Sequence, residues 1–289
     1  MRGMIESEAE RHPGTVVAHR SATERVIAAM REQVDGALSL HAMAEIAHLS
    51  PYHFARTFRQ VTGIPPGEFL TAVRLQKAKQ LLLTTDLGVA EICFEVGYSS
   101  LGTFTSRFTN LVGVPPGRMR RLPEEIYPAF ERVREGELAP PTALQGRGVD
   151  FRISGPDLDR SLIFAGLFPG AIPQCRPVVG TILTAPGTYR LAPPDGRYHL
   201  MAAALPLTED PLNLLMSGAA LRVGRGQSPV VVQAGRSIGR ADVEMRAPRA
   251  TDPPILVCLP ALLLERLGDF ATDSKIREVT LGNQKYPSK

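Results

Sequence analysis

Apolar residues recur every three or four positions through the first half of the chain, which is the period of a helix with one buried face. This pattern predicts an all-α region whose helices are separated by short polar turns. Ser50 and Pro51 are typical of a helix start, because serine caps the first turn and proline fits its first position. The expected helices span residues 23–34, 40–48, 51–61, 66–83, 89–96 and 100–112, after a flexible arm at 1–20.

From about residue 149 the pattern changes to short apolar runs separated by glycine and proline, which is typical of a small β-sandwich. We expect the sandwich over residues 149–250, after a linker at 125–148, and then a helix kinked by Pro260 with a loose tail over 251–289. The predicted fold class is therefore multidomain, with an all-α domain followed by a β-sandwich. The expected strands span residues 162–168, 177–183, 187–191, 198–205, 220–223, 229–233 and 241–245.

An internal repeat organises the helical half. Each copy consists of a short helix, a turn and a second helix, and a small residue (Ala47 or Cys93) stands where the two helices approach. This order predicts two helix-turn-helix units, in which the second helix presents its outer face to a major groove. The alternative is a plain helical bundle with an accidental repeat. At an offset of 50 residues, Phe54, Phe58, Gly63, Pro65, Pro66 and Gly67 recur as Phe104, Phe108, Gly113, Pro115, Pro116 and Gly117.

The distribution of charge favours the helix-turn-helix interpretation over a plain helical bundle. The whole chain has a net charge of +4, and residues 1–150 carry seventeen charges of each sign. Within 38–122, however, nine basic residues face five acidic ones, as contacts with phosphate would require. Residues 151–289 hold a further excess, sixteen basic against twelve acidic residues, that DNA binding does not explain.

Three segments resemble the DNA-binding domain of the AraC/XylS family of transcription regulators, in order and in spacing. They are SPYHFARTFRQVTG, RLQKAKQLLLTTDLGVAEICFEVGYSS and FTNLVGVPPGRMRR, and we place the domain at residues 21–124. The resemblance implies two helix-turn-helix units joined by a spacer helix at about 66–83. It implies that both second helices enter adjacent major-groove segments of double-stranded DNA, about 34 Å apart.

The resemblance places the base-reading face of the first unit on Tyr52, Ala55 and Arg56. An arginine can donate two hydrogen bonds to guanine, and a tyrosine can pack against thymine methyl groups. Ser50 and Arg59 are candidates for phosphate contacts, although Arg59 can equally be a solvated surface charge. His53 is expected to pack or to contact phosphate.

The second unit departs from the family pattern, because a serine stands where the family has an arginine. Direct readout by this unit is therefore expected to be weak, and three arginines after its last helix are expected to contact phosphates. The candidates in the second unit and after it are Leu101, Gly102, Thr103, Ser106, Arg107, Arg118, Arg120 and Arg121.

The second half of the chain is expected to sense a signal, to dimerise, or to do both. GTYRLAPPDGRYHLMAA and VVVQAGRSIGRADVEMR resemble the prealbumin-like sandwiches of carboxypeptidase regulatory domains. Tyr198 and His199 are candidate contacts for a small-molecule effector. The alternative is a β domain that only makes contacts with a second copy or with another protein, such as RNA polymerase. The domain order is reversed relative to most of the family, so the family's usual sugar-binding barrel is not assumed.

Other classes of function find little support. The sequence has no GxSxG, phosphate-loop, GxGxxG or HExxH motif, so an enzyme with a helical appendage is disfavoured, and no cofactor or metal is expected. Cys93, Cys175 and Cys258 lie far apart and form no CxxC pair, which indicates buried thiols in a reducing, cytoplasmic compartment. The sequence also carries no secretion signal and no membrane-spanning run, so no membrane partner is expected.

Overall fold

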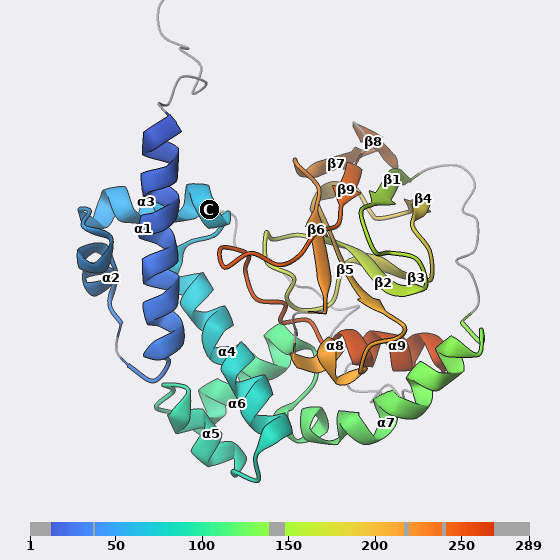
Figure 1. Cartoon of the computed structure of the whole chain (residues 1–289), viewed down its shortest axis with the longest axis horizontal. Helices are drawn as coiled ribbons and strands as arrows, with labels where there is room; N and C mark the ends of the chain where they lie inside the picture. Colours follow the sequence, from blue (N-terminus) through green and yellow to red (C-terminus); the bar gives the residue numbers. More distant parts are fainter. Residues whose placement is uncertain (1–12, 37, 139–147, 217–219, 239–240, 269–289) are drawn as a thin grey trace, which may run out of the picture.

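The computed structural model describes residues 13–36, 38–138, 148–216, 220–238 and 241–268 (Figure 1). The first half of the chain is helical and the second half is rich in strands, as the sequence predicts. The first-half helices are α1 (Pro13–Glu32), α2 (Leu40–Ala47), α3 (Pro51–Thr62), α4 (Pro66–Thr84), α5 (Val89–Glu95), α6 (Leu101–Val112) and α7 (Pro116–Arg134). The second half contains β1 (Val149–Ser154), β2 (Ser161–Phe168), β3 (Val179–Leu183), β4 (Gly187–Leu191), β5 (Gly196–Pro206), α8 (Leu212–Met216), β6 (Arg222–Arg225), β7 (Val230–Gln233), β8 (Arg236–Ile238), β9 (Ala241–Glu244) and α9 (Leu259–Leu267).

Both helix-turn-helix units are present, α2 with α3 and α5 with α6. The second helices have equal lengths of 12 residues, and each ends at a glycine in the left-handed region, Gly63 at φ 86° and Gly113 at φ 91°. A residue with a side chain is strained in this conformation, so glycine defines the end of each helix. The small residues expected at the close approach, Ala47 and Cys93, are both buried.

The repeat extends one helix further than the sequence predicts. α4 and α7 each have 19 residues and begin at equivalent prolines, Pro66 and Pro116. The prediction of a linker at 125–148 is wrong for residues 125–134, which belong to α7. Pro123 and Pro128 obscured this helix, because proline in a helix interior removes a backbone hydrogen bond. Residues 139–147 lie outside the described ranges.

The N-terminal arm is also shorter than predicted, because α1 begins at Pro13 rather than at about Thr23. The first turns of α1 are exposed, with Val16 and Val17 at 54% and 68% of their full exposure. Their helical conformation therefore owes little to burial and continues the packed part of the helix, where Val26, Ile27 and Met30 are fully buried. Residues 1–12 lie outside the described ranges.

The strands form a three-stranded sheet in the order β4-β1-β9 and a six-stranded sheet in the order β3-β2-β5-β7-β8, with β6 beside β5. One face of the larger sheet shares a core with the smaller sheet, to which Ile163 and Phe151 contribute. The opposite face, with Phe164, packs into the core of the helices. β2 is therefore buried along its whole length. The predicted two-layer sandwich does not include the helices that cover this second face of the sheet.

The C-terminal helix differs from its prediction in one respect. α9 begins at Leu259, so Pro260 lies in its first turn and does not kink it. Figure 1 shows α9 lying between α7 and the sheets, and α9 packs against both α7 and α8. The core of the helical half, one face of the larger sheet and α9 thus form one continuous apolar cluster. No helix in the described part of the chain is long and apolar enough to cross a membrane.

Candidate DNA-binding surface

The first unit exposes the side chains that the sequence places at the groove. Phe54 and Phe58 form the buried face of α3, with ring centroids 5.5 Å apart. Tyr52 lies on the opposite face and is 81% exposed, and Arg56 and Arg59 are exposed on the same helix. The outer face of α3 is thus aromatic and cationic, a combination suited to base edges and phosphates.

The remaining candidates of the first unit have structural partners. Ser50 is the N-cap of α3, and its hydroxyl accepts a hydrogen bond from the backbone N of His53 at 3.4 Å. The His53 ring packs edge-on against His19 of α1, with centroids 5.5 Å apart. Ala55 is half-buried. His53 therefore makes the packing contact that was one of its two expected roles.

The second unit presents a smoother surface. Ser100 caps α6, accepting a hydrogen bond from the backbone N of Thr103 at 3.4 Å. Leu101 is 44% exposed, and a Cβ added at Gly102 would meet only the Ser100 hydroxyl, at 4.0 Å. Ser106 and Arg107 are exposed. The long cationic side chain of α3 at Arg56 thus has a short hydroxyl as its counterpart in α6.

α4 links the two units as a spacer. Its 19 residues span about 28 Å at the rise of an α-helix. Arg74 fixes its first half to the segment that follows α1, because Nε donates to the Val34 carbonyl and Nη2 to the Gly36 carbonyl, both at 2.9 Å. Lys79 lies in its second half with 2% exposure and donates to the Ile255 carbonyl at 3.1 Å. Burial lowers the pKa of Lys79 to about 8.

The three arginines expected to follow the last helix lie inside α7 instead. Arg118 forms a two-pronged ion pair with Glu125 of the same helix. Arg120 donates to the backbone carbonyls of Leu82, at 3.3 Å, and of Leu87. Arg121 is exposed. Among these three, Arg118 and Arg120 bond within the protein, and Arg121 stays a candidate for a phosphate contact.

The β-rich region contacts the C-terminal ends of both second helices. At α6, the backbone N of Cys175 donates to the Leu111 carbonyl at 2.6 Å, and the N of Cys258 donates to the Val112 carbonyl at 2.9 Å. At α3, the guanidinium of Arg225 lies 2.9 Å from the position that a Cβ on Gly63 would occupy. The outer faces of α3 and α6 are therefore exposed, while the C-terminal ends of both helices contact the β-rich region.

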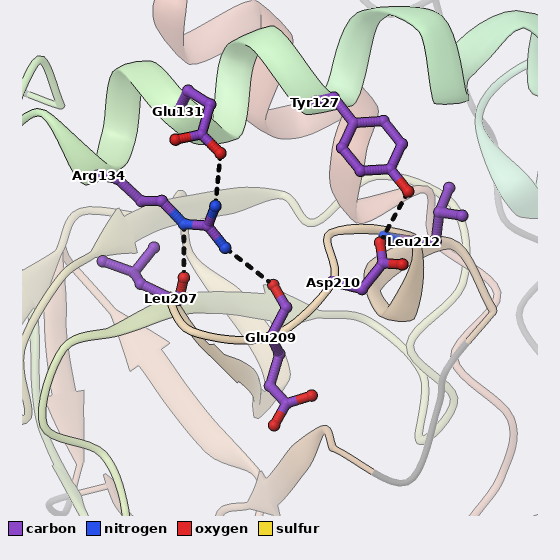
Figure 2. Close-up of polar contacts among 7 residues, drawn as sticks. All are labelled: Tyr127, Glu131, Arg134, Leu207, Glu209, Asp210 and Leu212. Carbon is purple, nitrogen blue, oxygen red and sulfur yellow. Dashed lines mark hydrogen bonds and ion pairs between the residues drawn. The ribbon is translucent and has the colours of Figure 1, made fainter.

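A polar junction ties α7 to the loop after β5, and sequence reasoning missed it. Arg134 donates to the carbonyls of Leu207, at 2.6 Å, and of Glu209, at 3.2 Å, and pairs with Glu131 (Figure 2). The Tyr127 hydroxyl donates to Asp210 at 3.1 Å. Burial raises the pKa of Tyr127, and so do this hydrogen bond and the negative charge of Asp210. The repeat was the available signal, since it predicts a full helix at 116–134.

Tyr198 and His199, the predicted effector contacts, do not share a site. The Tyr198 ring is buried between the sheets, and its hydroxyl donates to the carbonyls of Pro194, at 3.1 Å, and Asp195, at 3.4 Å. It therefore fastens the turn before β5. His199 is half-buried, and burial together with Arg225 and Arg197 lowers its pKa. The described residues contain no cluster of three or more metal-ligating side chains.

Comparison with known proteins assigns the helical region. Residues 43–122 match the model of a helix-turn-helix domain family. The chain is 36% identical over 92 residues to the bifunctional transcriptional activator/DNA repair enzyme AdaA of Bacillus subtilis, covering 31% of this chain and 44% of that protein. It is 37% identical over 103 residues to the RCS-specific HTH-type transcriptional activator RclR of Escherichia coli, covering 36% of each.

Among solved structures, the C-terminal domain of AraT, a response regulator from Geobacillus stearothermophilus, is 33% identical with a TM-score of 0.33. The match covers 35% of this chain and 84% of the AraT domain. The chain spans less than half the length of these two curated relatives. Residues 43–122 are thus a helix-turn-helix domain of a kind that occurs in transcription regulators.

Proposed function

We propose that the chain is an AraC-type transcription regulator that binds double-stranded DNA through two helix-turn-helix units. One observation carries the proposal: the second helices of the two units have equivalent boundaries and serine caps, and the spacer helix α4 links the two units. The match of residues 43–122 to a helix-turn-helix family, and relatives named as transcriptional activators, support it. The matches to these relatives lie in this region, so we propose no enzymatic role.

The first unit supplies most of the sequence specificity. Arg56 donates two hydrogen bonds to a guanine edge, and Tyr52 packs against neighbouring bases. Arg59 and Arg121 contact phosphates, which fixes the register without reading sequence. In the second unit, Leu101, Thr103 and Ser106 offer fewer base contacts, and Arg107 adds charge beside them. The operator therefore contains one sharply defined half-site and one permissive half-site.

The β-rich region modulates this binding in response to a signal. Its contacts with the ends of both second helices, at Gly63 and at Leu111–Val112, support this role, because a change there shifts α3 or α6. An alternative is a region that serves only to pair two copies or to contact RNA polymerase. A prealbumin-like topology for the β-rich region also stays a prediction. A titration of DNA binding against protein concentration distinguishes a cooperative dimer from a monomer.

Arg56→Ala tests the assignment of the first unit. Genome-wide pull-down with the purified full chain first defines the operator and its half-sites. We expect Arg56→Ala to bind that operator about 5- to 150-fold more weakly, the effect of losing 1 to 3 kcal/mol of base recognition. Arg152→Ala, an exposed arginine on β1, is the matched control and should bind like the parent. Unchanged affinity in Arg56→Ala would overturn the assignment.

A further inference from the structure

A cavity of about 1060 Å³ lies between the helix-turn-helix region and the larger sheet. Its helical wall includes Arg31 of α1, Thr62 at the end of α3 and Gln76 of α4. Its other wall comes from β2, β3, β5 and β6 and from the segment that leads into α9. The volume is that of a site for a small organic molecule. Tyr198 and His199 do not line it.

The chemistry of the cavity is divided between an apolar floor and a cationic rim. Phe164, Phe168 and Met201 project from the larger sheet and are each at most 6% exposed. Seven arginines line the cavity against three carboxylates. They are Arg31, Arg176, Arg190, Arg225, Arg246, Arg249 and Arg266, with Glu244, Asp252 and Glu265.

Two of the three carboxylates are already neutralised by arginines of the same wall. Glu265 pairs with Arg176, whose Nη1 lies 2.9 Å from Oε2. Asp252 accepts hydrogen bonds from Nη1 and Nη2 of Arg246 at 2.8 and 2.7 Å and from the Arg249 backbone N at 2.6 Å. Outside the cavity lining, Asp150 neutralises Arg190, with Nε 2.6 Å from Oδ1 and Nη2 2.8 Å from Oδ2. Arg31, Arg225 and Arg249, set against Glu244, then give the cavity a positive potential.

We infer that this cavity binds a small organic anion, a molecule with an apolar body and one carboxylate or sulfonate group. The apolar body lies on the floor formed by Phe164, Phe168 and Met201. The anionic group pairs with Arg225 of β6 and Arg249, for which the described residues supply no ion-pair partner. The site accounts for the positive charge of the second half of the chain, which DNA binding does not explain.

The position of Arg225 couples the site to the DNA-binding surface. Its guanidinium lies beside Gly63, at the end of α3 where the helix dipole is negative. An anion in the cavity competes for this guanidinium and withdraws it from the helix that carries Arg56. This consequence rests on the proposed function, whereas binding of the anion does not.

The matched fluorescent probes 8-anilinonaphthalene-1-sulfonate and N-phenyl-1-naphthylamine test the inference, because they share an aromatic body and only the first carries a charge. We expect the folded full chain to bind the sulfonate with at least tenfold higher affinity than the neutral amine. The double variant Arg225→Gln/Arg249→Gln should lose about tenfold in affinity for the sulfonate and keep its affinity for the amine. Arg152→Gln, on the exposed face of β1, removes one charge away from the cavity and should change neither.

Circular dichroism and thermal unfolding establish that each variant is folded before the titration. Equal affinity for the two probes, or sulfonate binding unaffected by the double variant, would overturn the inference. A saturating concentration of the sulfonate should change the affinity for the operator at least twofold in the parent and not in the double variant. An unchanged operator affinity would overturn the coupling. If the parent protein without any probe fails to bind DNA, the proposed function is overturned and the anion site is not.

Discussion

Lys79 of the spacer helix is predicted to make the protein more stable at alkaline pH. The side chain is 2% exposed, and burial disfavours its charged form. The nearby Cys258 opposes this effect, yet the pKa still falls from 10.5 to about 8. In the unfolded chain Lys79 titrates near 10.5, so between pH 8 and 10.5 the unfolded state binds the extra proton. The free energy of unfolding therefore rises with pH across this window.

The magnitude follows from the two pKa values. At 1.36 kcal/mol per unit, a shift from 10.5 to about 8 corresponds to about 3 kcal/mol, and most of it falls between pH 7 and pH 10. Lys79→Met keeps a side chain of similar length and removes the charge. It also removes the hydrogen bond to the Ile255 carbonyl, which costs about 1 to 3 kcal/mol at every pH. Only the lost titration makes the effect of the substitution depend on pH.

Urea unfolding of the full chain at pH 7 and pH 10 measures this contribution. The rise in the free energy of unfolding between these values should be about 2 to 3 kcal/mol smaller in Lys79→Met than in the parent. The tyrosines and the other cysteines that titrate in this range contribute to both proteins and cancel. Cys258 interacts with Lys79, so it is replaced by alanine in both proteins before the comparison. Lys77→Met, an exposed lysine of the same helix, is the control and should retain the full rise. An equal rise in Lys79→Met and the parent would refute the reasoning.

Two further pairs of substitutions compare neighbouring or equivalent positions. Gly63→Ala and Gly113→Ala should each lower the free energy of unfolding by about 1 to 2 kcal/mol, because both positions are left-handed; a neutral result in thermal melting would contradict the role given to the end glycines. Arg120→Ala should cost about 1 to 3 kcal/mol of stability, because two backbone carbonyls lose their donor. Arg121→Ala should leave stability unchanged and lower the salt dependence of DNA binding by about one ion, and the reverse pattern would show that the two arginines had been misassigned.

The helix-turn-helix units could be predicted from the sequence because their information is local. Ser50 with Pro51 marks a helix start, Gly63 and Gly113 mark helix ends, and the spacing of Phe54 and Phe58 marks a buried face. Most strands were predicted for a similar reason, from short apolar runs between turns. β1 and β8 were not among the expected strands.

The elements that escaped prediction depend on long-range contacts. Pro123 and Pro128 argue against a helix, and α7 forms nevertheless because its buried residues, among them Ile126 and Phe130, complete a core with α9. The arginine-rich cavity escaped for the same reason, because its walls come from segments as distant as Arg31 and Arg249. Periodicity along the chain describes which face of an element is buried and leaves open what covers it.

The packing of α7 on α9 has a consequence for synthesis of the chain on the ribosome. α7 ends at Arg134 and α9 begins at Leu259, so 124 residues lie between the two helices. At about 5 to 20 residues per second, the apolar face around Phe130 waits about 6 to 25 s for its covering helix. During that interval the nascent chain exposes an apolar helix face. Slow translation, or the absence of a chaperone, would therefore favour aggregation before the protein reaches DNA.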